Sequence, residues 1–109
     1  MASIQLTDNF VNTAADTVET IYTSPTDNST IIETFTAANN SSVNASYKGY
    51  IVSPSGTEQP QRPFKIIVWG DIDSGAGLVN QVIPPGGSLR VESSAIDSIY
   101  FTVTGKVLV

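Results

Sequence analysis

The chain of 109 residues contains no histidine and no cysteine. The missing histidine removes the side chain that most often serves as a general base, and the missing cysteine removes the thiol nucleophile. Both are also the commonest zinc ligands, and without cysteine there is no disulfide framework. Imidazole and thiolate chemistry are therefore excluded, and cysteine pairing gives no indication of the redox compartment.

Basic side chains are scarce. Five lysines and arginines stand against ten acidic residues, which gives a net charge of −5. The five are Lys48, Arg62, Lys65, Arg90 and Lys106. Binding to phosphates or to an anionic bilayer surface requires a clustered basic face, which five scattered cations do not provide. We therefore expect neither a nucleic-acid partner nor a membrane partner.

Long apolar runs are also absent, and none approaches the roughly 20 residues that a membrane-spanning helix needs. The first eight residues have neither a basic start nor a continuous apolar stretch, so they do not predict a secretory signal. The protein is expected to be made in a cytoplasm.

The residues that are present favour a folded β domain. Apolar residues make up 40% of the chain and charged residues only 14%, which is atypical of a charge-driven disordered segment. Short alternating runs rich in β-branched residues are separated by turn residues. We predict an all-β fold: a single β-sandwich, immunoglobulin-like or jelly-roll, with seven or eight antiparallel strands. The expected strands are residues 17–23, 30–38, 43–52, 64–69, 78–83, 89–92 and 98–109.

Two positions in this scheme have alternatives. Residues 1–16 are weakly patterned and are expected to form an N-terminal arm or an edge strand outside a sandwich of residues 17–109; an arm would reach a neighbouring subunit. The C-terminal residues Val107 to Val109 would either complete an inner strand or be buried against a partner. The apolar run 64–69 is expected to be a central strand covered on both faces.

No catalytic residue, metal ligand or cofactor site is predicted, and we expect a protein that is not an enzyme. Serines abound, but the chain lacks a histidine base and the Ser-x-x-Lys and Gly-x-Ser-x-Gly motifs. Paired carboxylates among the ten acids stay open. Asp71 and Asp73 resemble part of a calcium loop, but a solvated turn is the preferred interpretation because the later ligand positions are not acidic.

Loops and aromatic side chains offer further candidates. Residues 53–63 form the longest irregular stretch, which predicts either a functional loop or a plain surface loop. Four Asn-x-Ser/Thr triplets, at Asn28, Asn39, Asn40 and Asn44, are expected in turns and on exposed strand faces. A sugar-stacking platform would use Trp69, Tyr47, Tyr50, Tyr22 and Tyr100. Packing in the core or at its rim is the preferred role for Trp69, while Tyr50 and Tyr100 fall on more polar faces and are expected to be exposed.

Several segments together resemble small all-β virion structural proteins of tailed bacteriophages. They are Ile-Tyr-Thr-Ser-Pro at 21–25, residues 30–39, Ile-Pro-Pro-Gly-Gly-Ser-Leu at 83–89, Asp-Ser-Ile-Tyr at 97–100 and Thr-Gly-Lys at 104–106. The resemblance spans residues 17–109 and consists mainly of β-turn chemistry. Where that family often carries Gly-Asp-Ser-Ile, this chain has Ile96 before Asp97, so the turn there is expected to differ.

The resemblance implies a virion protein, first of all a capsid decoration (cement) protein that binds and stabilises the outer shell. The implied partner is the major capsid protein or another virion protein, and the implied assembly is a homo-oligomer, preferably a trimer. A small tail or baseplate component is the second possibility of this kind. The aromatic residues leave a carbohydrate-binding β-sandwich module as an alternative of a different class.

Overall fold

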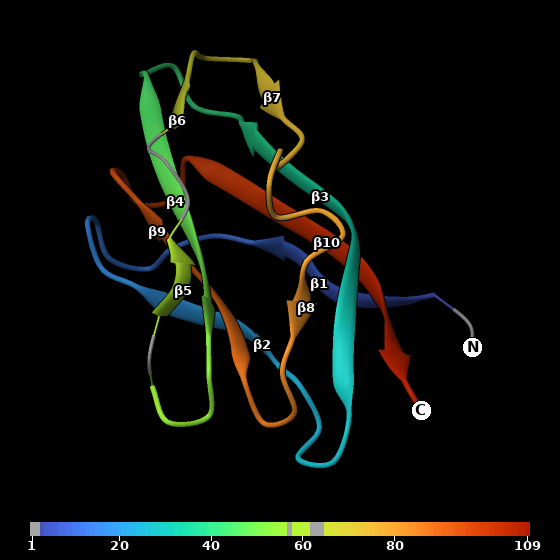
Figure 1. The fold of residues 1–109 in the computed structure, drawn as a ribbon. Coiled ribbons are helices and arrows are strands. Elements are labelled where there is room, and N and C mark those ends of the chain that lie inside the picture. The colour runs from blue at the N-terminus through green and yellow to red at the C-terminus, as the bar shows by residue number, and fades with distance from the viewer. Residues whose placement is uncertain (1–2, 57, 62–64) are drawn as a thin grey trace.

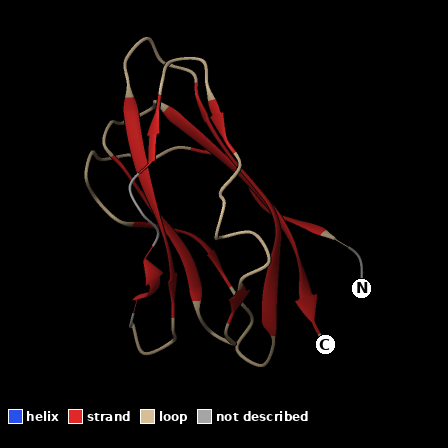
Figure 2. Ribbon diagram, turned by 45° about the horizontal axis from the view of Figure 1, so that its top comes forward, coloured by secondary structure: helices blue, strands red, loops and turns tan. Residues whose placement is uncertain are grey.

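A computed structural model describes residues 3–56, 58–61 and 65–109. In this part of the chain it contains ten strands and no helix, and the strands form two antiparallel sheets that face each other (Figures 1 and 2). The strands are β1 (Ile4–Phe10), β2 (Glu19–Thr23), β3 (Ser29–Asn39), β4 (Ala45–Val52), β5 (Glu58–Gln61), β6 (Lys65–Ile67), β7 (Ile72–Asp73), β8 (Val82–Ile83), β9 (Ser88–Ser93) and β10 (Ile99–Leu108). The predicted all-β sandwich is confirmed.

The strand order is that of a jelly roll. One sheet runs β1-β10-β3, with β7 and β8 both paired to the far edge of β3; the other runs β2-β9-β4, with β5 and β6 both paired to β4. Counting β5 with β6 and β7 with β8 as interrupted strands gives eight strands. The first strands of the chain pair with the last ones, β1 with β10 and β2 with β9, as in one long hairpin. This hairpin is folded over so that β10 also pairs with β3 in one sheet and β9 pairs with β4 in the other. Such double Greek-key sheets define the jelly roll.

Alternating side chains from both sheets meet in one core. Phe35 on β3, Tyr47 on β4 and Phe101 on β10 form an aromatic cluster with ring centroids 5.4–5.9 Å apart. All three are at most 2% exposed. Aromatic pairs at this spacing add to the stability gained from burial, so the cluster connects the two sheets at their centre.

Both chain ends belong to the first sheet. Residues 4–10 are an edge strand, with Ile4 opposite Gly105 and Leu6 in the core, so the edge-strand alternative holds for them and they do not extend as an arm. The C-terminal strand β10 lies between β1 and β3, which makes it the predicted inner strand.

Three expected elements differ from the structure. The run 64–69 is not a central strand: β6 pairs only with β4, so it lies at an edge, and Phe64 falls outside the described residues. Of residues 78–83 only Val82 and Ile83 form a strand, because residues 76–80 form a turn in which the Leu78 N–H donates to Gly75 O and the Gln81 N–H donates to Leu78 O. The expected loop 53–63 contains β5, while residues 57, 62 and 63 lie outside the described part.

Candidate functional site: an apolar tip

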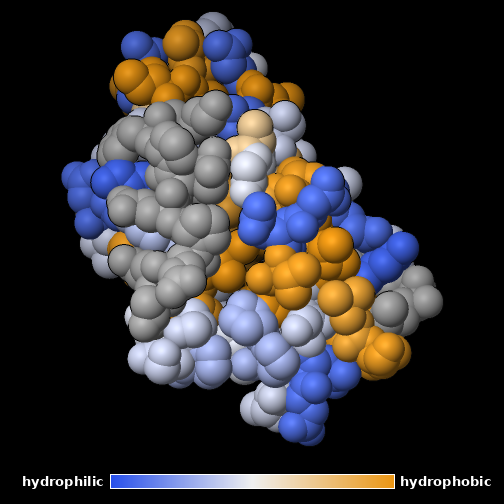
Figure 3. Space-filling view, in the orientation of Figure 1, coloured by the Kyte–Doolittle hydropathy of each residue, from blue (hydrophilic) through white to orange (hydrophobic). Residues whose placement is uncertain are grey.

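Exposed apolar side chains gather at the end of the sandwich where β3 turns into β4 and β6 leads to β7 (top of Figures 1 and 3). We call this surface the apolar tip. Its residues, between 49% and 74% exposed, are Val43, Ile66, Val68, Trp69 and Ile72. Single exposed apolar residues are ordinary, whereas a contiguous group usually marks an interaction site.

One buried amide braces the apolar tip. The Nδ2 of Asn39 donates to the carbonyl oxygens of Val43 and Ile67, both at 2.8 Å. Its Oδ1 accepts hydrogen bonds from the backbone N–H and hydroxyl of Ser41, at 3.0 and 2.8 Å. Asn39 is fully buried, so this side chain fixes two loops from inside. The expectation that the four triplet asparagines lie on exposed positions is wrong for Asn39, because its amide is needed here.

The backbone of Asn39 holds the same loops a second time. Its N–H donates to Asp71 O at 3.0 Å, and its carbonyl accepts the Gly70 N–H at 2.9 Å. The Asp71 N–H donates to Val68 O at 2.9 Å, which closes a four-residue turn with Trp69 as its second residue. Gly70 has a φ of 81°, which a side chain would disfavour, so glycine permits this turn. These hydrogen bonds fix the backbone of the turn that carries Trp69.

The exposure of Trp69 differs from the prediction. It is 61% exposed because the strand ends at Ile67 and leaves the indole in the turn beyond the sheet. The expectation for Tyr50 is also wrong, since it is only 4% exposed. Tyr50 is covered because β4 is flanked on both sides, with Arg90 opposite on β9 and Gln61 opposite on β5. Its hydroxyl donates to Glu92 Oε1 at 3.0 Å.

The other candidate aromatics do not join Trp69. Tyr47 is in the core, Tyr22 is partly buried with its hydroxyl 3.0 Å from Thr30 Oγ1, and Tyr100 is half-buried on β10. The structure therefore forms no shared aromatic platform from these five residues.

The two aspartates of the considered calcium loop have different surroundings. Asp73 is engaged within the fold, because its Oδ2 accepts the Tyr47 hydroxyl and, at 3.1 Å, the Gly75 N–H. Asp71 is exposed in the turn of the apolar tip. Among the described residues, no three acidic side chains come together in a way that could hold a metal ion.

An open strand edge adjoins the apolar tip. The N–H of Ser46 donates to Ser94 Oγ and its carbonyl accepts the Ser94 N–H, both at 2.9 Å, so the peptide groups of Ser46 face away from β6. Ile66 lies opposite Ser46 in the antiparallel register. In such a pair both residues direct their backbone groups away from each other, so the N–H and C=O of Ile66 point outward from the sheet. In the described part of the chain no strand pairs with this edge.

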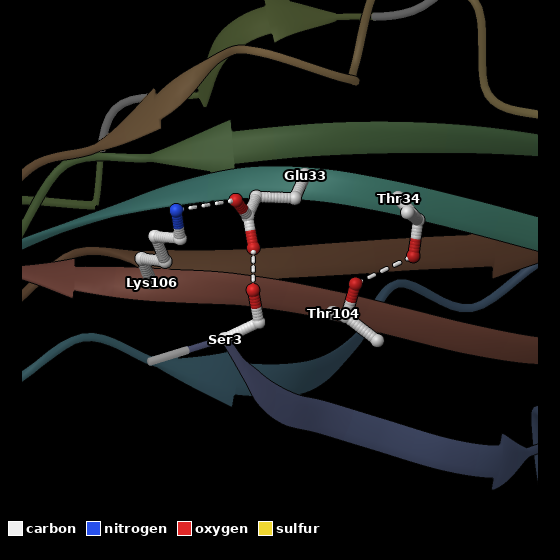
Figure 4. Close-up of polar contacts among 5 residues, drawn as sticks. All are labelled: Ser3, Glu33, Thr34, Thr104 and Lys106. Atoms are coloured by element: carbon white, nitrogen blue, oxygen red, sulfur yellow. Dashed lines mark hydrogen bonds and ion pairs between the residues drawn. The ribbon is translucent and has the colours of Figure 1, made fainter. Parts of the chain in front are cut away.

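The outer face of the first sheet has a different character. Glu33 accepts the Ser3 hydroxyl at 2.6 Å and pairs with Lys106 at 3.3 Å, and the hydroxyls of Thr34 and Thr104 are 2.6 Å apart (Figure 4). The hydrogen bond from Ser3 is the main cause of the lowered pKa of Glu33; burial opposes it, and the hydrogen bond and charge of Lys106 lower the pKa further. A shallow groove of about 470 Å³ runs alongside. Exposed polar contacts of this kind contribute little to stability or to tight binding.

Sequence reasoning missed most of the apolar tip. It singled out Trp69 but not Val43, Ile66, Val68 or Ile72. A signal was present, because apolar residues continue on both sides of the Gly70-Asp71 turn, where turn residues are usually polar.

In the part of the chain that the structure describes, no helix is long and apolar enough to cross a membrane. No protein-family model, no curated protein and no solved structure matches this chain.

Proposed function

We propose that this protein is a structural component of a bacteriophage virion, and that it decorates and stabilises the outer shell of the capsid. The observation that carries the proposal is the apolar tip, a rigid group of exposed apolar side chains on a small β-sandwich. Such a surface suits a protein that works by contact. The resemblance of residues 17–109 to small phage virion proteins indicates the kind of partner, another protein of the virion.

The energetics of the apolar tip favour assembly. Fully burying one large apolar side chain is worth about 1.5–3 kcal/mol, so five of them provide a substantial driving force. Asn39 holds the loops in place before binding, which reduces the entropy lost when a partner covers them. Tryptophan is among the residues most often found as binding hot spots.

The proposed partners are the major capsid protein, or another virion protein, and further copies of this chain. Repeated symmetric positions on a shell suit a homo-oligomer, and three-fold positions suit the trimer that the sequence analysis prefers. Jelly rolls are frequent among viral capsid domains, which supports the proposal by analogy of fold alone. A tail or baseplate component is the second possibility in the same class.

A carbohydrate-binding module is the alternative of another class. Jelly rolls also include lectins, and an exposed indole can stack on a sugar face. However, Tyr50 is buried, Tyr47 belongs to the core, and Tyr22 and Tyr100 are each partly buried, so Trp69 is the most exposed of the candidate aromatics. The other members of the apolar tip are aliphatic, and the exposed Asp71 in the same turn as Trp69 is available to accept hydrogen bonds from sugar hydroxyls.

Co-sedimentation with purified capsid shells tests the proposal. The wild-type chain is expected to bind the shells, and Trp69→Ser is expected to bind at least about tenfold more weakly, as for a hot-spot residue. Val82→Ser is the control, because Val82 is 46% exposed and lies on β8, which pairs with Thr30 and Ile31 at the end of β3 away from the apolar tip. Failure of the wild-type chain to bind any virion particle would contradict the proposal. Binding to a glycan array that Trp69→Ser abolishes would favour the carbohydrate-binding module.

A further inference from the structure

We propose that the groove on the outer face of the first sheet binds a neutral sugar. The groove has a volume of about 470 Å³ and is lined by residues 33–36 of β3 and by Ser74, Ala76 and Val79 from the segment between β7 and β8. None of these residues belongs to the apolar tip. The inference therefore goes beyond the proposed capsid contact and does not rest on it.

The groove exists because the far edge of β3 is not paired along its whole length. β7 pairs with Ala37 and Ala38, and β8 pairs with Thr30 and Ile31. Among the described strands, none pairs with residues 33–36 on this side, and the chain between β7 and β8 forms a turn there instead (Figure 1). The turn and the outer face of β3 together enclose the groove.

The turn beside the groove is anchored to the core. Leu78 is 1% exposed and packs in the core, and its N–H donates to Gly75 O at 2.8 Å. Gly75 lies so close to the Phe35 ring that a Cβ on this glycine would overlap it. A ligand therefore does not have to order this segment when it binds, which would cost affinity.

Two hydroxyl groups indicate the kind of ligand. Thr36 is half-buried and Ser74 is exposed, and within the described residues neither hydroxyl makes a hydrogen bond. Each of them can both donate and accept. An apolar ligand would cover these hydroxyls and leave them unpaired, at a cost in free energy, whereas the hydroxyls of a sugar would pair with them.

The charges at the groove favour a neutral ligand. Among the described lining residues only Glu33 is charged, and its carboxylate is turned toward Lys106 at 3.3 Å and Ser3 at 2.6 Å (Figure 4). An anionic ligand would meet this carboxylate on a chain with a net charge of −5. A cationic ligand would compete with Lys106 for the same carboxylate.

The apolar part of the lining suits the C–H face of a sugar ring. Ala76 is exposed, and Val79 is partly buried against the core. Small-molecule pockets of this volume usually combine an apolar lining with a few polar groups that fix the orientation of the ligand. The ring of Phe35 lies in the core and is not available for stacking, so we expect a dissociation constant on the order of 1 mM for each site. Many copies on one particle would strengthen this weak binding.

Amide NMR spectra of the isotope-labelled full chain, titrated with neutral sugars, test the inference. The probes are the methyl glycosides of glucose, galactose, mannose and N-acetylglucosamine, each up to about 100 mM. At least one of them is expected to shift the signals of residues 33–36 and 74–79, and to leave those of Val68 and Trp69 in the apolar tip unchanged. No shift in the groove with any of the four sugars would overturn the inference.

Three variants locate the binding site. Thr36→Val keeps the β-branched shape but removes one groove hydroxyl, and it is expected to weaken sugar binding about threefold to tenfold, as does the loss of one hydrogen bond. Ser74→Ala is expected to have a similar effect from the other element that lines the groove. Thr20→Val is the matched control, because Thr20 is an exposed threonine on β2 in the other sheet, and its affinity should equal that of the wild type. Equal affinities for all three variants would contradict a site in the groove.

The capsid assay separates this inference from the proposed function. Sugar binding in the groove by a chain that binds no virion particle would support the groove site and refute the virion role. Binding to shells without any sugar binding would do the reverse. Sugar binding that Trp69→Ser abolishes and Thr36→Val does not affect would place the sugar at the apolar tip and overturn the inference.

Discussion

Asn39 is an unusual residue to find at the end of a strand with no exposed surface. An amide has two donors and one acceptor, and here all of them are used by Val43, Ile67 and Ser41. Buried polar groups that are fully hydrogen-bonded can specify one arrangement of loops, because every alternative leaves some of them unpaired.

The substitution Asn39→Ala is expected to lower the free energy of unfolding by about 2–3 kcal/mol, since it removes four hydrogen bonds, among them the buried one to the Ile67 carbonyl. Urea denaturation followed by circular dichroism measures this loss. Asn40→Ala, at the exposed neighbouring position, is expected to stay within about 0.5 kcal/mol of the wild type. Equal stabilities for the two variants would mean that Asn39 does not brace the apolar tip.

Glu19 organises the loop between β1 and β2 in a comparable way. Its carboxylate accepts hydrogen bonds from Asn12 Nδ2, from the Thr13 N–H and hydroxyl, and from the Ala14 N–H. Burial raises the pKa of Glu19, but these hydrogen bonds together outweigh it and lower the pKa below the ordinary value of 4.5. The folded state therefore favours the ionised form of this side chain.

A lowered pKa in the folded state has a definite pH signature. The stabilisation is present above pH 4.5 and is lost as the pH falls through the lower pKa of the folded state. Glu19→Gln is therefore expected to be less stable than the wild type at neutral pH, by on the order of 1 kcal/mol in a solvent-screened site. The difference should shrink in acid, as measured by urea denaturation at several pH values. A difference that stays constant down to strongly acidic pH would contradict this assignment.

At the scale of the elements, the edge strand β1 protects the inner strand β10. Leu6 packs into the core, and β1 pairs with β10 from Gly105 to Phe101. Deleting residues 1–10 removes this cover and exposes the backbone edge of a long apolar strand.

We expect the deletion to produce an unstable or aggregating protein, which light scattering during thermal unfolding would detect. The control is the wild-type chain at the same concentration. If the shortened chain folded with unchanged stability and assembly, β1 would be dispensable, and the role assigned to it here would be wrong.

The turn after β7 depends on Gly75. Its φ is 67°, and a Cβ at this position would overlap the Phe35 ring. Gly75→Ala is expected to cost roughly 2–4 kcal/mol, from backbone strain combined with overpacking. Gly56→Ala is the control, since Gly56 has a φ of 93° but nothing within 4 Å of the added atom. Denaturation midpoints would show a larger loss for Gly75→Ala; equal losses would remove the packing contribution.

Alternation along the chain was enough to predict the sandwich, because inward and outward positions repeat along β10 as far as Gly105 and along β3 on either side of one interruption at Glu33 and Thr34. Alternation does not say which strands are neighbours. The run around Ile66 is apolar on both faces, which indicates a covered strand, yet it lies at an edge. The prediction for Tyr50 was wrong in the opposite direction. Tyr50 was expected to be exposed because it lies on a polar face, but it is buried because strands flank β4 on both sides. Both errors concern lateral position in the sheet, which only long-range pairing determines.

At the scale of the whole molecule, the jelly roll joins distant parts of the chain. β1 pairs with β10 and β2 with β9, so most of the chain lies between paired strands. Loops of this length must close before the corresponding contacts can form, which slows folding.

Refolding is therefore expected to take milliseconds to seconds, the range of all-β domains with non-local pairing. Stopped-flow circular dichroism is the suitable measurement. The fluorescence of Trp69 is expected to change little on folding of the monomer, because the indole is 61% exposed in the folded chain. Refolding within microseconds would indicate that local contacts dominate.

The adjacency of β1 and β10 has a consequence for how the gene could be rearranged. Ile4 lies opposite Gly105, and the start of β1 and the end of β10 are on the same side of the molecule, away from β6 and β7 (Figure 1). A short linker would join them, and new ends could open in the exposed turn of residues 54–56. A circularly permuted gene could therefore encode the strands in a different order while the folded protein keeps the same arrangement of strands. A cargo fused before β1 or after β10 would lie on the side of the molecule away from the apolar tip.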